Sequence, residues 1–238
     1  MSFKSKIDFC GLANGTTILL KSHNEGRSSS VVTCENDEGD TVDATVVGHV
    51  MDPSNDYALK ADLTNFDIVL GAVNTVNLGT TEAPDNHYFA LKSVTIGTSN
   101  SGDVALAAQS EEVASATPTR TYTVRIASLK CRCKAQIINS LFSLSGTGVH
   151  LQSANYTIGA NITHTTVDGE RVTADIYGAS ISVAISAKQA GSVKPTITPG
   201  SATDVVTIVA GDPSESRPDS DYASVSATVT RYLTADAE

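Results

Sequence analysis

Alternation between apolar and polar residues is the dominant pattern along the chain. Residues 122–126, 181–185 and 223–229 each place an apolar residue at every second position, with small or polar residues between them. A period of two directs successive side chains to opposite faces of a sheet. The pattern therefore predicts an all-β fold, built as antiparallel β-sandwiches or partial barrels.

One segment, 134–144, departs from this alternation. Its spacing predicts a short helix, with a strand as the alternative. We therefore expect at most one or two short helices in the fold. The apolar residues near helical spacing are Ile137, Ile138, Leu141, Phe142 and Leu144.

A hairpin is predicted at Asp168-Gly169, a strong turn signal between strand-like stretches at 161–167 and 171–177. A three-residue loop ending at Glu170 would fix the register, and one face would collect the apolar side chains. The expected opposing pairs are Ile162 with Ile176, His164 with Ala174, and Thr166 with Val172. The residues expected to be buried are Ile162, Val172, Ala174 and Ile176.

The same hairpin is predicted near the start of the chain. Residues 38–48 match residues 168–178, and further on 95–96 and 103–104 match 196–197 and 204–205 in the same order. Two collinear blocks indicate an internal duplication. By this analogy Val32 would oppose Val46 and Cys34 would oppose Ala44, and the buried residues would be Val32, Val42, Ala44 and Val46.

The duplication predicts two related β domains, at 1–130 and 145–238, with 131–144 as a connector. The two later matches are separated by fewer residues than the first match is. The first copy would therefore carry an insertion around 50–93. We expect this insertion to project as an arm that contacts a neighbouring subunit. Its strand-like apolar run contains Phe66, Ile68, Val69 and Leu70. The polar stretches 110–121 and 211–221 would be long loops.

Charge is unevenly distributed along the 238 residues. The net charge is −10, which argues against binding nucleic acid through a basic surface. Residues 1–119 hold 16 acidic and 6 basic residues, whereas residues 120–238 hold 10 of each. The abundance of Thr and Val favours strands, and this composition argues against a helical bundle or coiled coil, which would be rich in Ala, Glu, Lys and Leu.

No pattern of catalytic, cofactor-binding or metal-binding residues emerges. The five histidines, His23, His49, His87, His150 and His164, lack metal-ligand spacing. His164 is expected to face inward as a hydrogen-bonded core or rim histidine. The four cysteines, Cys10, Cys34, Cys131 and Cys133, are too few and too uneven for a disulfide framework, so reduced thiols are expected. We therefore predict no enzyme and no cofactor.

Two acidic turns, 35–40 and 52–56, could gather oxygen ligands for calcium, but the first lacks the alternation of a calcium-binding loop. Solvated surface is the favoured interpretation of both. The glycine-rich stretch 146–150 lacks the lysine of a phosphate-binding loop, so it is interpreted as a tight turn before a strand. The acidic stretch 212–221 is expected to be an exposed loop.

The start of the chain resembles no secretory signal, and no apolar run reaches the length of a membrane helix. The sequence therefore predicts a protein made in a cytoplasm, without a membrane partner.

In composition and organisation the chain resembles structural proteins of tailed-bacteriophage virions. Residues 10–17 and 167–178 resemble segments of phage and prophage proteins. Tail-tube subunits are the nearest match within this class. That resemblance implies a homo-oligomer, as a trimeric or hexameric ring, that contacts other virion proteins and encounters DNA only as passing cargo. It places the protein in the virion after assembly in the host cytoplasm.

Alternative functions are a head-decoration protein, another virion β-sandwich protein or an adhesin-like binding module. A hydrolase that uses His150 or His164 ranks far below these. In a tube, Asp37, Glu38, Asp40 and Asp43 would be exposed to water in the lumen, where they would repel phosphates. This arrangement predicts that added salt strengthens assembly by screening repulsion between subunits.

Overall fold

The computed structural model confirms the all-β class. Strands make up 71% of it, the sheets are antiparallel, and the described residues contain no helix. The residues that the structure describes are 6–38, 40–99, 102–116, 120–133, 135, 142–167, 170–190, 196–199, 205–210, 214–216 and 222–236.

The strands of the first half are β1 (Ile18–Asn24), β2 (Arg27–Glu35), β3 (Thr41–Met51), β4 (Ser54–Leu59), β5 (Leu63–Leu70), β6 (Val73–Asn77), β7 (Asn86–Ser99), β8 (Gly102–Asp103), β9 (Ala105–Val113), β10 (Tyr122–Leu129) and β11 (Arg132–Cys133). Those of the second half are β12 (Phe142–Ser145), β13 (Val149–Val167), β14 (Glu170–Gln189), β15 (Thr196–Pro199), β16 (Val205–Ala210), β17 (Ser214–Ser216) and β18 (Ala223–Leu233).

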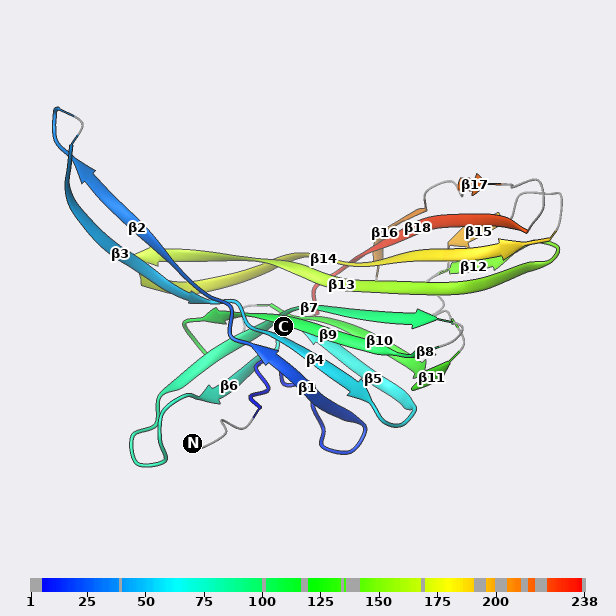
Figure 1. The fold of residues 1–238 in the computed structure, drawn as a ribbon, viewed down its shortest axis with the longest axis horizontal. Coiled ribbons are helices and arrows are strands. Elements are labelled where there is room, and N and C mark those ends of the chain that lie inside the picture. The colour runs from blue at the N-terminus through cyan, green and yellow to red at the C-terminus, as the bar shows by residue number, and fades with distance from the viewer. Residues whose placement is uncertain are drawn as a thin grey trace.

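One ten-stranded antiparallel sheet forms the backbone of the fold (Figure 1). Its main path runs β1-β4-β9-β7-β13-β14-β18-β16, while β6 pairs with β7 and β17 with β18. The pairing of β7 with β13 joins strands of the two predicted domains directly. The sheet is therefore continuous across the predicted boundary at 131–144.

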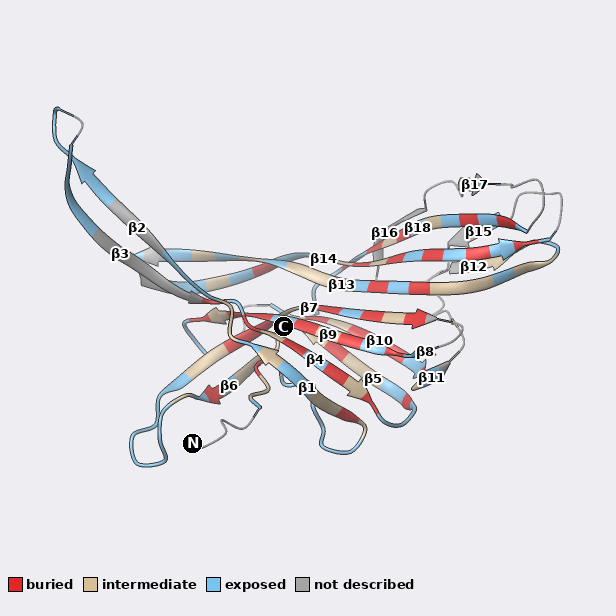
Figure 2. Cartoon of the chain, viewed as in Figure 1, coloured by how far each residue is buried: buried red, intermediate tan, exposed pale blue. Residues whose placement is uncertain are grey.

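The main core joins this sheet to the two-stranded β5–β10 pair. Ile68 and Ile126 from that pair are fully buried in the same cluster as Val94 and Ile96 of the large sheet. The predicted alternation is confirmed, and buried and exposed residues alternate along the central strands (Figure 2). The confirmed inward-facing residues are Tyr122, Val124, Ile126, Ile181, Val183, Ile185, Ala223, Val225 and Val229.

The predicted helix at 134–144 is wrong where the structure describes it. Residues 142–144 belong to β12, which pairs with β15. Phe142 and Leu144 alternate with Ser143 and Ser145, so the local pattern has the period of a strand. Residues 136–141 lie outside the described residues.

The predicted arm at 50–93 is also wrong. This segment forms β4, β5, β6 and the first half of β7, and its side chains Ile68, Leu70 and Phe89 are fully buried. The apolar run is covered inside its own chain, because β5 pairs along its length with β10 and packs into the main core. The ribbon that projects from the body is instead β2–β3 (Figure 1).

The internal duplication is not confirmed by the fold. Residues 95–96 lie in β7, between β9 and β13 in the large sheet, whereas the matching 196–197 lie in β15, which pairs only with β12 among the described strands. The two matched hairpins also differ, because β2–β3 forms a sheet of its own while β13–β14 is part of the large sheet.

Candidate functional site

The β2–β3 hairpin, residues 27–51, is a projecting two-stranded ribbon that we call the acidic ribbon. Every described side chain between Arg27 and Val50 is exposed. Met51, at its base, is 5% exposed and packs with Phe9, Val76 and Phe89 in a small second core cluster. The ribbon is thus anchored at one end and solvated along the rest of its described length (Figure 2).

The base of the acidic ribbon needs glycine at position 26. Gly26 has a φ of 54°, a left-handed conformation that favours glycine. A Cβ atom there would lie 2.1 Å from the carbonyl oxygen of Asp52, whose amide donates a hydrogen bond to the Gly26 carbonyl at 3.0 Å. This close approach sets the direction in which the ribbon leaves the body.

The predicted register of this hairpin is wrong by one residue. Val32 opposes Thr45 rather than Val46, and Cys34 opposes Asp43 rather than Ala44. The Asn36 side chain closes the turn by accepting hydrogen bonds from the amides of Glu38 and Asp40, and a register shift follows between Cys34 and Glu35. A shift of one residue moves side chains to the other face.

The predicted buried face is therefore absent from the described part of this ribbon. Val42 is 61% exposed and Ala44 is also exposed, whereas the side chains of Val32 and Val46 lie outside the described residues. The acids Asp37, Glu38, Asp40 and Asp43 are all exposed, which confirms that part of the electrostatic prediction.

The second hairpin also extends as a ribbon, residues 161–177, which we call the outer ribbon. It leaves the sheet at a bulge, where Gly178 (φ 65°) and Ala179 lie between the Asn161–Tyr177 and Gly159–Ser180 pairs. A glycine with this conformation is typical of such bulges, which bend a strand. Beyond the bulge, no described strand other than the hairpin partner pairs with either strand.

The predicted register of the outer ribbon is right for two pairs out of three. Ile162 opposes Ile176 and His164 opposes Ala174, but Thr166 opposes Arg171 because the register shifts after Thr165. Of the residues expected to be buried, Ile176 is buried at 2% exposure, Ile162 and Ala174 are half-buried, and Val172 is 48% exposed. Val167 and Tyr177 are also exposed on this ribbon.

His164 is a hydrogen-bonded rim histidine, as predicted. Its Nε2 atom lies 2.6 Å from Oε1 of Glu111 on β9, and Lys92 Nζ donates a hydrogen bond to Oε2 of the same carboxylate at 2.9 Å. His164 and Glu111 side chains are each 9% exposed. The Nδ1 atom of His164 has no hydrogen-bond partner among the described residues.

The sequence pattern did not reveal Glu111 and Lys92. Lys92 is the extra residue at a register shift between Leu91 and Ser93. This bulge interrupts the alternation along β7, so the alternation does not predict that the Lys92 side chain meets Glu111. Two successive acids, Glu111 and Glu112, in an otherwise small and apolar strand are the one signal of a buried ion pair. Burial raises the pKa of the Glu111 carboxyl, but hydrogen bonds from Lys92 and His164 outweigh this effect and hold it below its usual value.

Replacing Glu111 with glutamine should lower the free energy of unfolding by about 1–3 kcal/mol at neutral pH, because the charged hydrogen-bond acceptor is lost. Since the folded pKa of Glu111 is depressed, its contribution is present above the ordinary value of 4.5 and is lost as the pH falls through the folded value. The difference between wild type and Glu111→Gln should therefore shrink in acid. Urea unfolding at several pH values measures this, with the exposed Glu82→Gln as control. A difference that is constant with pH would contradict the assignment.

Cys10 belongs to a buried polar cluster and is unsuited to nucleophilic chemistry. Ser110 Oγ donates a hydrogen bond to Cys10 Sγ at 2.9 Å, and the thiol in turn donates to Oδ1 of Asn55 at 3.6 Å. Burial raises the pKa of the Cys10 thiol to about 11, so the reactive thiolate is disfavoured. The described cysteines Cys10, Cys34 and Cys131 are all free thiols.

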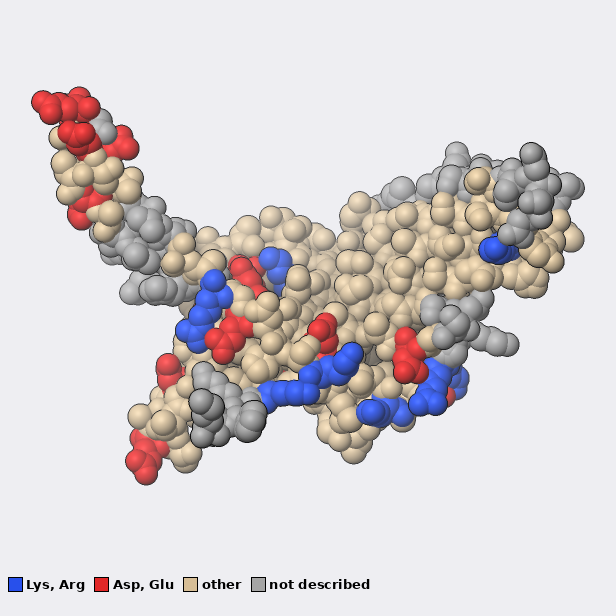
Figure 3. All heavy atoms as spheres, viewed as in Figure 1, with Lys and Arg blue, Asp and Glu red and all other residues tan. Residues whose placement is uncertain are grey.

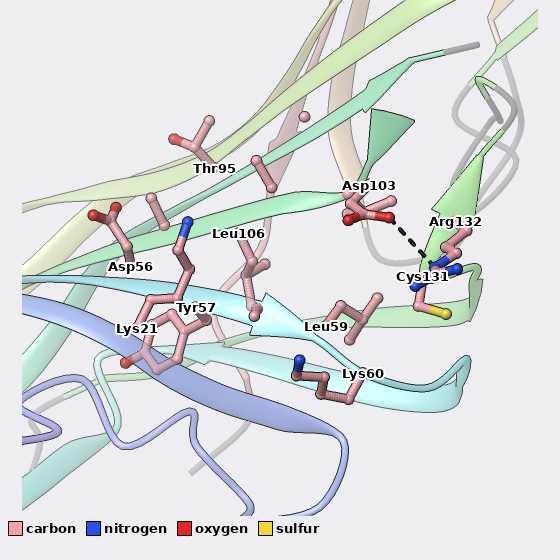
Figure 4. Close-up of a pocket in the computed structure, with 15 residues that line it drawn as sticks. Lys21, Asp56, Tyr57, Leu59, Lys60, Thr95, Asp103, Leu106, Cys131 and Arg132 are labelled. Atoms are coloured by element: carbon pink, nitrogen blue, oxygen red, sulfur yellow. Dashed lines mark ion pairs between the residues drawn. The ribbon is translucent and has the colours of Figure 1, made fainter. Parts of the chain in front are cut away.

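A groove of about 740 Å³ lies on the body across β1, β4, β9 and the β11 segment. Lys21, Lys60 and Arg132 line it together with Asp56 and Asp103 (Figure 4), and we call it the basic groove. Arg132 Nε lies 3.5 Å from Asp103 Oδ1, with both side chains highly exposed. The ammonium groups of Lys21 and Lys60 make no ion pair with a described residue.

The remaining sequence candidates do not assemble into a site. His150 is exposed in β13, and the glycine-rich stretch before it forms a tight turn, with Gly148 at a φ of 68°, as predicted. In the described ranges, no group of three or more His, Cys, Asp or Glu could hold a metal ion. None of the described segments forms a helix that is long and apolar enough to cross a membrane.

Neither a protein-family model nor a curated protein matches the chain.

Proposed function

We propose that this protein is a non-enzymatic structural subunit of a tailed-bacteriophage virion, which self-assembles into rings as a tail-tube protein does. Head decoration is the alternative within the same class. The proposal combines the sequence resemblance with one structural observation, the acidic ribbon.

The acidic ribbon supports assembly because its order is costly for an isolated chain. A lone two-stranded hairpin is at best marginally stable in water, since each ordered residue loses roughly 1–2 kcal/mol of backbone entropy. Between Arg27 and Val50, no described side chain is buried to offset this cost. A partner that covers the ribbon would supply the missing contacts.

The outer ribbon supports the same conclusion. Val167, Val172 and Tyr177 are 55%, 48% and 43% exposed on a short two-stranded segment. Exposed apolar side chains beside strand edges favour pairing with another chain. The acidic ribbon projects from the body, and the outer ribbon extends beyond the strands that pair with the rest of β13 and β14, so both are suited to bridging neighbouring subunits.

Sedimentation velocity and negative-stain electron microscopy of the purified protein test this proposal. We expect rings or tubes that form with increasing protein concentration. A protein that stays monomeric at every concentration, and that antibodies fail to detect on purified phage particles, would contradict the proposal. Antibody labelling along the tail would favour a tube protein, and labelling on the capsid would favour head decoration.

A further inference from the structure

Negative charge is concentrated at the far end of the acidic ribbon. Five acids lie within residues 35–43, and no Lys or Arg occurs between Arg27 and Lys60. Figure 3 shows these acidic side chains gathered at the tip, away from the body. None of the five makes an ion pair with a described residue. The acids are Glu35, Asp37, Glu38, Asp40 and Asp43.

Basic residues outnumber acidic ones in the basic groove, where Asp56 and Asp103 lie among Lys21, Lys60 and Arg132. Arg132 pairs with Asp103, which leaves the ammonium groups of Lys21 and Lys60 without an ion pair to a described residue. Lys21 is the extra residue at a register shift between Leu20 and Ser22, on the edge strand β1. Lys60 directly follows β4, where its amide donates to the Thr17 carbonyl at 2.8 Å. Figure 4 shows Lys21 beside Tyr57 and Asp56, and Lys60 near Leu59. Figure 3 shows basic side chains gathered over this part of the body.

The ribbon tip cannot fill the groove of its own chain. The tip points away from the body at one end of the molecule, whereas β1 and β4 lie near the middle of the body and β11 lies still farther from the tip (Figure 1). A contact between tip and groove therefore has to join two copies. Because it uses different surfaces on the two copies, such a contact is head-to-tail, and head-to-tail contacts produce closed rings or open filaments.

We propose that the tip of the acidic ribbon, residues 35–43, docks into the basic groove of the next copy. This inference rests on the proposed self-assembly and specifies the surfaces that carry it. The groove volume lies within the range of binding pockets, about 300–1,000 Å³, and complementary charge fixes the register of such contacts. The partner is a second copy of this chain, because the chain itself supplies both charges.

This arrangement reverses the salt dependence that the sequence alone predicts. Acids that face an open lumen would repel one another, so salt would strengthen assembly. Acids that dock against Lys21 and Lys60 attract the neighbouring copy, so salt should weaken assembly by screening that attraction. The exposed position of the acids agrees with both arrangements, but their place on a projecting tip favours docking.

Charge reversal tests the contact. Asp37→Lys, Glu38→Lys and Asp40→Lys together reverse the sign of the tip's charge, because they turn three of its five acids into lysines. Lys21→Glu with Lys60→Glu reverses the groove. Each variant places like charges together, so each should self-associate at least about a hundredfold more weakly than wild type by sedimentation velocity. A mixture of the two variants should assemble again, because each tip then meets a groove of opposite charge.

The pair Glu82→Lys with Asp85→Lys is the control, because it raises the net charge in the same direction as the tip reversal but lies on the β6–β7 hairpin. It should assemble as wild type does. Recovery in the mixture also shows that both reversed variants are folded. If either reversed variant assembles normally, or if the mixture stays monomeric, the tip–groove contact is wrong while self-assembly stands. If the wild type itself never assembles, both proposals fail.

Discussion

Replacing Ile176 with aspartate is expected to lower the free energy of unfolding by about 3–5 kcal/mol, because it places an unpaired charge in the core and removes packed methyl groups. Ile176 is 2% exposed in the main core. It packs closely against the backbone of Gly71, because a Cβ atom added at Gly71 would lie only 2.7 Å from the Ile176 Cδ1 atom. For a chain of this length, the melting temperature should fall by about 10 °C. Thermal and urea unfolding followed by circular dichroism measure both quantities.

Val172→Asp is the matched control on the same strand. Alternation alone predicts that Val172 and Ile176 are equivalent, but Val172 is 48% exposed and is the residue left unpaired at the register shift. Its replacement should change the free energy of unfolding by no more than about 0.5 kcal/mol. Equal losses for the two variants would show that the outer ribbon is covered along its whole length in the monomer.

Removing the acidic ribbon is expected to abolish assembly and leave the monomer folded. Residues 28–50 can be replaced with Asn-Gly, because Arg27 opposes Met51 and a two-residue turn closes such a pair. Gly26 and Met51 are kept, so the anchor in the second core cluster remains. Stability should change by no more than about 1 kcal/mol, because every described side chain that is lost is exposed.

The contrasting deletion is that of residues 54–91, in the segment where the sequence predicts the arm. It removes Ile68, Leu70 and Phe89 from the core, so the chain should not fold. Sedimentation velocity and circular dichroism of both deletions separate the two possibilities. A ribbonless protein that still forms rings would show that the ribbon is dispensable, and the outer ribbon would then be the principal contact.

The sequence by itself determined the β class and much of the central packing. The strands at 122–126, 181–185 and 223–229 have the predicted inward faces, because alternation depends only on neighbours within one strand. The opposition of His164 to Ala174 was predicted from the Asp168-Gly169 turn signal alone. These features are local, and a few successive residues contain the information.

Only the tertiary structure decided the register of β2–β3, which hairpin projects and which polar groups meet. Bulges after Leu20, Leu91 and Thr165 each insert a residue that alternation does not signal, and each one moves later side chains to the other face. The contact of His164 with Glu111 joins β13 to β9, and the covering of Ile68 requires β10. Such contacts depend on residues far apart in the chain, where the pattern of either strand alone does not specify its partner.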